Sequence, residues 1–212
     1  EKFCSPSQRE MKLLHLLLLL LLPCTRAGLP EEDMDTVQLV ALHGYPVQTI
    51  AVTTADGYDL AIHRIPFGRN DSAHNRLNRP AVFLQHGLLA SSADWVINLP
   101  HQSLGFLLAD AGFDVFMGNV RGNVYSREMT NKTRAGKKAY WSFSWDEMAR
   151  FDLPAMLEKA LAVSGQSSLY YVGYSQGTTT MFALLSENPE YSAKIRKFFA
   201  LAPVGSVGSM KG

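Results

Sequence analysis

A serine flanked by two glycines is the strongest chemical signal in the sequence. Residues Gly173 to Gly177 read Gly-Tyr-Ser-Gln-Gly, which fits the pattern Gly-x-Ser-x-Gly. The apolar run LYYV leads into this motif, and the helix-forming run TTTMFALL follows it. A sharp turn from strand to helix projects a serine hydroxyl above a sheet, where it can attack an ester carbonyl. We therefore predict that Ser175 is a nucleophile; the alternative is a glycine-rich turn with an incidental serine.

An acyl-transfer serine also needs two backbone amides that stabilise the oxyanion of the tetrahedral intermediate. One is the amide of the residue after the nucleophile, here Gln176, and the other comes from an earlier strand end near a glycine. The run FLQHGLLASS has that character, and we predict the amide of Leu88, which follows Gly87. We interpret His86 as a structural histidine, because the catalytic histidine of such hydrolases follows the nucleophile in the chain.

The sequence offers no partner for the proton of Ser175. Hydrolases of this type carry the serine first, then an acid, then a histidine. All six histidines precede Ser175, and the acids after it are Glu187 and Glu190, on or just past the helix that leaves the motif. We expect neither acid to reach back to the serine. The sequence therefore predicts that the triad aspartate and histidine are absent from this chain.

The elements that position these residues alternate between strands and helices. Residues 47–65 are β-branched-rich around Asp56 and Gly57, which predicts a hairpin. The further predicted strands are AVFLQHG, FDVFMGN, LYYVGYS and KFFALAPVG, and the predicted helices are SLGFLLADAG, WDEMARFDLPAMLEKALAVSG with a kink at Pro154, and TTTMFALLSENP. This order predicts an α/β fold: a mostly parallel sheet with helices on both faces and a leading hairpin.

The first residues predict secretion. Residues 11–27 contain a lysine, a leucine-rich run and small residues up to Ala27, which is the layout of a signal peptide. A membrane span needs about 20 apolar residues, so we expect no transmembrane anchor. Residues 1–10 are interpreted as an upstream extension, and residues 28–212 as part of a single domain. Both cysteines, Cys4 and Cys24, precede that domain, which therefore has no disulfide available.

Composition narrows the possible partners. The chain has 20 basic and 19 acidic residues and a net charge of +1, which gives no reason to expect nucleic acid. Two acceptor sequons, at Asn70 and Asn131, are compatible with a secreted glycoprotein.

Taken together, the motifs resemble the acid lipases of the gastric and lysosomal type in the α/β-hydrolase superfamily. The likeness runs from about His43 to Val204 and rests on several long runs in order: HGYPVQTIAVTTADGYDLAIHRIP, PAVFLQHGLLASSADWVINLP, SLGFLLADAGFDVFMGNVRGNVYSR, FSWDEMARFDLPAML, YYVGYSQGTTTMF and FFALAPV. The resemblance implies hydrolysis of neutral lipid esters, triacylglycerols or steryl esters, at a lipid–water interface. It also implies a secreted or lysosomal enzyme that uses neither cofactor nor metal, with Ser175 as nucleophile and the amides of Leu88 and Gln176 as oxyanion hole.

The sequence departs from the family in two respects. Tyr174 stands where the family usually has histidine, which bears on local packing or pH optimum rather than on the reaction. The family's acid, histidine and lid-forming insertion would come after residue 212. We therefore expect the N-terminal portion of a lipase that is inactive by itself, with an exposed apolar edge at residues 197–203. The alternative is a non-catalytic lipid-binding or carrier protein that keeps only the front half of the fold.

Overall fold

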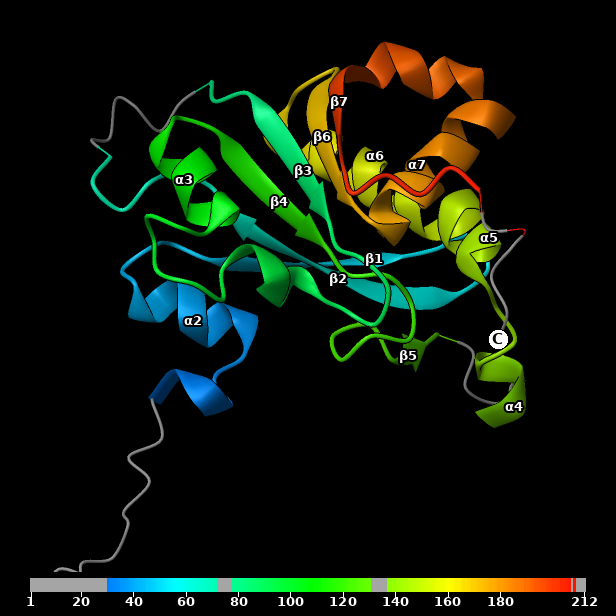
Figure 1. Ribbon diagram of the computed structural model, residues 1–212, viewed down its shortest axis with the longest axis horizontal. Coiled ribbons are helices and arrows are strands. Elements are labelled where there is room, and N and C mark those ends of the chain that lie inside the picture. The colour runs from blue at the N-terminus through cyan, green and yellow to red at the C-terminus, as the bar shows by residue number, and fades with distance from the viewer. Residues whose placement is uncertain (1–29, 72–77, 131–136, 207, 209–212) are drawn as a thin grey trace, which may run out of the picture. The chain divides into compact units, whose positions relative to one another are not determined.

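The computed structural model describes residues 30–71, 78–130, 137–206 and 208. Its sheet has the strand order β1-β2-β4-β3-β6-β7, and β5 pairs with β2 (Figure 1). The strands are β1 (Gln48–Thr53), β2 (Tyr58–Ile65), β3 (Ala81–Gln85), β4 (Asp114–Gly118), β5 (Glu128–Met129), β6 (Leu169–Tyr174) and β7 (Ile195–Leu201). The α-helices are α2 (Thr36–Leu42), α3 (Leu104–Asp110), α4 (Lys137–Tyr140), α5 (Trp145–Glu147), α6 (Leu153–Ser164) and α7 (Gln176–Glu187).

Shorter helical segments complete the chain. They are the 3-10 helices η1 (Pro30–Asp33), η3 (Ser92–Trp95) and η5 (Pro189–Lys194), and the π-helical η4 (Met148–Asp152). The chain divides into two units, Glu1–Asp33 and Met34–Gly212. Of the first unit only η1 is described, and the predicted signal peptide, residues 11–27, lies outside the described residues.

The sheet is mixed, and its first two strands form the predicted hairpin. β1 and β2 are antiparallel from Gln48↔Arg64 to Thr53↔Asp59, and β2 is antiparallel to β4. The turn between β1 and β2 contains Gly57, whose φ of +94° lies in the left-handed region that glycine tolerates. The pairs β3–β4, β3–β6 and β6–β7 are parallel. The sheet therefore confirms the predicted fold, with a parallel portion formed by β4, β3, β6 and β7.

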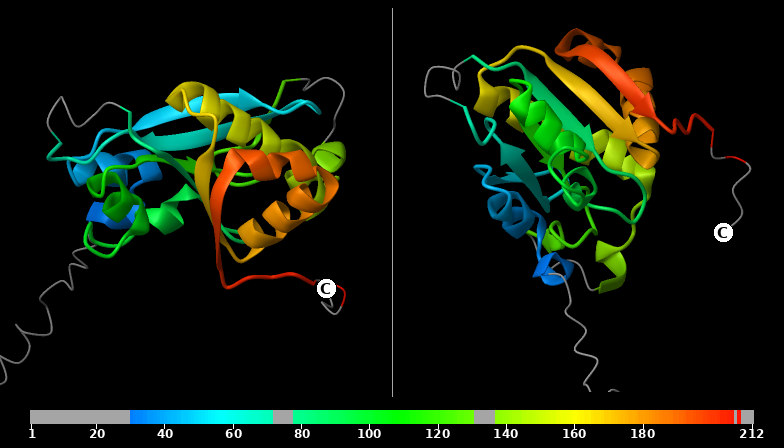
Figure 2. Two further views of the ribbon diagram at one scale, coloured as in Figure 1. Left: turned by 90° about the horizontal axis from the view of Figure 1, so that it is seen from above. Right: turned by 60° about the vertical axis from the view of Figure 1, so that its left-hand side comes forward.

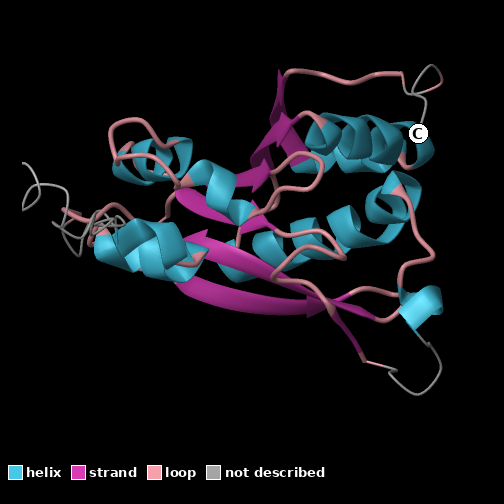
Figure 3. Cartoon of the chain, turned by 60° about the horizontal axis from the view of Figure 1, so that its bottom comes forward, coloured by secondary structure: helices cyan, strands magenta, loops and turns pink. Residues whose placement is uncertain are grey.

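Helices cover both faces of the sheet (Figures 2 and 3). Because successive side chains of a strand point to opposite faces, Phe83 and Phe116 pack with α6 and α7, whereas Leu84 and Met117 pack with α2 and α3. These two apolar clusters hold the parallel strands rigidly from both sides. The ends of β3, β4 and β6 lie in register through the pairs of Gln85 with Gly118 and with Gly173. Loops that leave these ends therefore meet at one edge of the sheet.

The predicted long helix over residues 145–165 forms, but its irregularity differs from the simple proline kink we expected. A π-helical turn, η4, separates α5 from α6, and Pro154 lies in the first turn of α6. Proline cannot donate a hydrogen bond to the carbonyl four residues back, and the wider π turn directly before it accommodates that loss. The helix ends at Gly165, which adopts φ +68° as the C-cap.

The strand β7 lies at one edge of the sheet and exposes apolar side chains. Phe199 is 48% exposed and Leu201 is 42% exposed. The expected apolar edge is therefore confirmed for the described part of this segment. None of the helices in the described ranges is long and apolar enough to cross a membrane.

Candidate active site

Ser175 occupies the turn between β6 and α7, in a backbone conformation that few serines adopt. Its φ is 50° and its ψ is −114°, a strained combination for a residue with a side chain. The turn is held by backbone bonds. The Ser175 amide donates to the Leu201 carbonyl at 3.0 Å, and the Ser175 carbonyl accepts from the amide and hydroxyl of Thr178 at 2.8 and 2.6 Å. The half-buried side chain is thus fixed at the end of β6, an interior strand of the sheet.

The two glycines of the motif are required by close backbone packing. A Cβ on Gly173 would lie 2.7 Å from the carbonyl oxygen of Gly177. A Cβ on Gly177 would lie 2.5 Å from the carbonyl oxygen of Gln85, at the end of β3. Neither contact is sterically allowed, so the turn brings α7 as close to the sheet as glycine permits. The strand-turn-helix setting predicted for Ser175 is therefore present.

The N-terminus of α7 starts directly after Ser175. The Ser175 side chain makes no capping hydrogen bond to the helix. The first amides of an α-helix have no intrahelical acceptor, and they carry the positive end of the helix dipole. This end of α7 therefore favours negative charge beside Ser175, and the amide of Gln176 belongs to it. The role of that amide in catalysis stays a prediction.

The loop after β3 lies against the Ser175 turn. A Cβ on Gly87 would be 3.2 Å from the Cβ of Ser175 and 3.1 Å from the ring of Tyr174. Leu89, two residues on, has φ +58° and is 98% exposed. The predicted second oxyanion residue, Leu88, therefore lies in a strained loop packed closely on the serine turn. Its catalytic role also stays a prediction.

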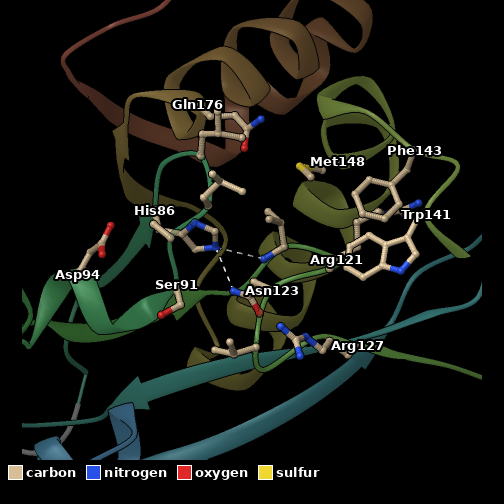
Figure 4. Close-up of a pocket in the computed structure, with 16 residues that line it drawn as sticks. His86, Ser91, Asp94, Arg121, Asn123, Arg127, Trp141, Phe143, Met148 and Gln176 are labelled. Carbon is tan, nitrogen blue, oxygen red and sulfur yellow. Dashed lines mark hydrogen bonds between the residues drawn. The ribbon is translucent and has the colours of Figure 1, made fainter. Parts of the chain in front are cut away.

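A cavity of about 490 Å³ opens beside these two segments. Leu88 and Gln176, the two residues predicted to supply oxyanion amides, both line it, whereas Ser175 itself does not. Across from Gln176 lie Met148, Phe143 and Trp141, and the polar side of the cavity carries Asn123 and Arg127 (Figure 4). The cavity can therefore accept a mainly apolar ligand.

None of the histidines in the described parts of the chain hydrogen-bonds to the Ser175 hydroxyl. His63 and His86 are buried and bonded elsewhere: Nδ1 of His63 to the Ser92 hydroxyl at 2.7 Å and Nδ1 of His86 to the Gly87 carbonyl at 2.7 Å. Burial lowers the pKa of each to about 4, so both rings are neutral at pH 7. His43 packs edge-on against Phe106, and His101 is exposed.

The two acids that follow Ser175 lie at the other end of α7. Glu187 is the last residue of this 12-residue helix, and at a rise of 1.5 Å per residue the helix spans about 18 Å. Its carboxylate accepts two hydrogen bonds from Arg150 at 3.0 Å. Glu190 lies farther on, in η5. Neither acid is positioned to orient a base at Ser175.

Sequence reasoning missed a buried charged cluster beneath the cavity. Arg121 is 2% exposed and binds Asp152 at 2.8 Å and Asp56 at 2.7 and 2.9 Å. Its guanidinium lies 3.9 Å from the centre of the Tyr58 ring. Burial raises the pKa of Asp152 to about 6, although the bonds from Arg121 oppose this rise. The cluster connects three segments: the hairpin turn, the loop that follows β4, and η4. The loop and η4 both contribute residues to the cavity lining. An arginine three residues after an apolar strand was the available signal.

The remaining predicted positions are at the surface or outside the described residues. Asn70 is exposed in a turn, as a glycosylation acceptor requires, whereas Asn131 lies outside the described residues. Tyr174 is 44% exposed and lines a second, smaller hollow with Asp94 and Trp95.

Comparison with protein families gives two overlapping matches. Residues 36–99 match the partial alpha/beta-hydrolase lipase region, and residues 80–210 match the alpha/beta hydrolase fold. Among solved structures, the epoxide hydrolase VrEH1 from Vigna radiata aligns with 78% of this chain and 40% of its own, with a TM-score of 0.51 and 17% identity. That likeness concerns the fold alone.

Curated relatives are far more similar in sequence. Lipase lipl-1 of Caenorhabditis elegans is 54% identical over 184 residues, which cover 86% of this chain and 45% of the relative. The gastric triacylglycerol lipase of Rattus norvegicus is 48% identical (85% and 45% covered), and the lysosomal acid lipase/cholesteryl ester hydrolase of Macaca fascicularis is 50% identical (84% and 44%). The chain thus spans less than half the length of these relatives.

Proposed function

The chain belongs to the α/β-hydrolase family, in the group of gastric- and lysosomal-type acid lipases, and on this premise we propose that its protein hydrolyses neutral lipid esters through Ser175. The observation that carries the proposal is the conformation of Ser175. A serine with φ 50° at the end of an interior strand, between two sterically required glycines, is the arrangement that presents a nucleophile. Strain of this kind persists where function requires it.

In the proposed reaction, the Ser175 hydroxyl attacks the ester carbonyl as its proton passes to a base. The amides of Leu88 and Gln176 donate to the oxyanion of the tetrahedral intermediate, and the alcohol leaves with a proton from the base. Water then attacks the acyl-serine, and the fatty acid leaves as the hydroxyl is restored. We propose that the base is a histidine outside these 212 residues, because all six of theirs precede Ser175. The isolated chain is then expected to be inactive.

The surroundings of the cavity support a neutral lipid ester as substrate. Its lining includes apolar side chains of Val120, Phe143 and Met148. Several apolar residues at its rim are also exposed to solvent: Leu88 by 57%, Leu89 by 98%, Val124 by 62% and Trp141 by 54%. Exposed apolar groups of this kind favour contact with an acyl chain or a lipid–water interface. The printed names of two relatives, a triacylglycerol lipase and a cholesteryl ester hydrolase, agree with this class.

We further propose that the protein is secreted or delivered to lysosomes, with residues 11–27 removed as a signal peptide and Asn70 available for glycosylation. The leucine-rich leader, the exposure of Asn70 and the gastric and lysosomal relatives support this route.

Replacement of the nucleophile tests the proposal. In the native protein, Ser175→Ala is expected to lower kcat for triacylglycerol or steryl ester hydrolysis by about 10⁶-fold, as when a triad serine is removed. Ser186→Ala, an exposed serine on the same helix, is the matched control and is expected to keep full activity. Substantial turnover by the Ser175→Ala variant would contradict the assignment.

A second candidate is a non-catalytic lipid-binding protein. The observation that favours it is that Ser175 has no hydrogen-bonded histidine within the described residues. This candidate predicts that the native protein binds a non-hydrolysable lipid ether equally well with and without Ser175→Ala, and that neither form hydrolyses the corresponding ester.

A further inference from the structure

We infer that His86 is a positioning residue for the oxyanion hole: its imidazole fixes the peptide plane between Gly87 and Leu88, and so directs the Leu88 N–H towards the Ser175 site. This inference rests on the proposed function, because it assigns a role within the same reaction. It assigns His86 no direct contact with the substrate. The inference depends on the geometry of one peptide group and on the buried hydrogen bonds around the ring.

The bond from His86 acts on the peptide that carries the predicted oxyanion donor. Nδ1 of His86 lies 2.7 Å from the carbonyl oxygen of Gly87. The peptide between Gly87 and Leu88 is planar and trans, so its C=O and N–H point in opposite directions. A ring that holds the Gly87 carbonyl therefore also sets the direction of the Leu88 N–H, which points away from the ring.

The other ring nitrogen determines the tautomer. Nε2 of His86 lies 3.4 Å from the Val120 amide nitrogen, which can only donate, and 3.3 Å from Nδ2 of Asn123. Nε2 must therefore be an acceptor, and the single proton of the neutral ring is on Nδ1, where it is donated to Gly87. Burial of the ring, which is 2% exposed, keeps it neutral at pH 7. The direction of the bond to Gly87 is thus fixed.

The same network anchors the loop at its far end. Asn119 Oδ1 accepts from Nδ2 of Asn123 at 2.8 Å and from the amide of Ser92 at 2.9 Å. Asn123 in turn contacts His86, and the Ser92 hydroxyl contacts His63 at 2.7 Å. Asn119 therefore connects both ends of the segment 86–92, to Ser92 directly and to His86 through Asn123. Such a buried network holds a loop more rigidly than a single bond does.

The segment needs this support because it is strained and closely packed. Leu89 holds φ +58°, a left-handed conformation that is strained for a residue with a branched side chain. Gly87 packs so closely on Ser175 that a Cβ would lie 3.2 Å from the serine Cβ. With Leu89 nearly fully exposed, no burial of its own side chain holds the loop in place. The buried bonds at residues 86 and 92 do so instead.

Two substitutions of His86 in the native protein separate positioning from general stability. His86→Asn keeps an N–H near the position of Nδ1, whereas His86→Phe keeps the ring volume without a donor. Both lose the acceptor at Nε2, so their difference isolates the bond to Gly87. Kinetics are measured per folded molecule, with folding checked by circular dichroism at the assay temperature.

We expect His86→Phe to lower kcat by about 10- to 100-fold with KM changed less than about twofold, because a misdirected oxyanion donor acts mainly in the transition state. A boronic acid that forms a tetrahedral adduct should lose affinity in parallel with kcat. His86→Asn should recover most of both losses. If kcat falls equally in the two variants, or if both keep wild-type kcat, the role of the bond to Gly87 is refuted.

A readout without catalysis keeps this inference separate from the proposed function. The ¹⁵N NMR spectrum of the native protein should show His86 neutral, with the proton on Nδ1. Hydrogen exchange at the Leu88 amide should be faster in His86→Phe than in His86→Asn. A proton on Nε2, or equal exchange in the two variants, would overturn the inference even in an active lipase. Absence of ester hydrolysis by the wild-type protein would instead remove the proposed function.

Discussion

The turn at Ser175 and the loop at Arg121 both follow parallel strands and flank the same cavity, yet they are held in different ways. The first is held by backbone contacts: two glycines that tolerate no Cβ, and a serine in a left-handed conformation. The second is held by side chains, since Arg121 is buried between two carboxylates and the ring of Tyr58. Backbone fit positions Ser175, and buried charge supports the wall of the neighbouring cavity.

The largest effect is expected at the charge-held loop. Arg121→Met leaves Asp152, which is fully buried, without its partner, and the free energy of unfolding should fall by about 3–5 kcal/mol at pH 7. The loss should be smaller at pH 5, because Asp152 can then be protonated. Urea unfolding at both pH values measures this. The control is Arg150→Met, an exposed pair with Glu187 that should leave stability unchanged. Equal effects of the two substitutions would show that charge does not hold this loop.

A smaller loss of stability, with a large loss of activity, is expected at the backbone-held turn. Gly177→Ala places a Cβ 2.5 Å from the Gln85 carbonyl, and overpacking of this kind costs about 1–3 kcal/mol. Because the shift occurs beside Ser175, ester hydrolysis should fall more steeply than the folded fraction. Gly205→Ala, where the new methyl group meets open space, is the control. Thermal unfolding and hydrolysis rates measured together test this; wild-type kcat in Gly177→Ala would contradict it.

A third effect is absent at pH 7 and appears only as the pH falls; it concerns the buried histidine His63. Burial lowers the pKa of His63 from 6.5 to about 4. The unfolded chain therefore binds a proton below pH 6.5 that the folded chain does not take up until about pH 4. Stability from this group is complete above pH 6.5 and falls as the pH decreases through that window, by at most about 1.4 kcal/mol per pH unit.

His63→Gln, which can still hydrogen-bond to Ser92, should flatten the dependence of stability on pH between 6.5 and 4. Asp152, whose pKa burial raises to about 6, contributes with the opposite sign in both proteins and cancels in the comparison. Chemical denaturation from pH 7 to pH 4 measures the two curves. Parallel curves would show that burial does not lower the pKa of His63.

The two regions also differ in how far the sequence predicts them. The Ser175 turn is predictable because its signals are local: glycine spacing, an apolar strand before it and a helical run after it. The hairpin at residues 48–65 is predictable for the same reason. Arg121 pairs with Asp152 and Asp56, which lie 31 and 65 positions away, and no local pattern joins them. The sequence around Arg121 therefore does not indicate which acidic residues it pairs with.

The site contains a second case of this limit. Sequence order indicates that His86 is not the catalytic base, but the atoms it contacts follow only from the tertiary structure. Asn119 and Asn123 carry no recognisable motif, and their amides become informative only once the loop after β4 lies beside the loop after β3. The π turn before Pro154 is similar: the proline predicts an irregularity, whereas its form depends on packing.

Covalent labelling tests the central claim most directly, because it reports on the serine itself. A fluorophosphonate ester is incubated with the native protein, and the modified peptide is identified by mass spectrometry. We predict a single adduct on Ser175, which is absent in Ser175→Ala and retained in Ser186→Ala. An adduct on another serine, or active hydrolysis with Ser175 unmodified, would contradict the account.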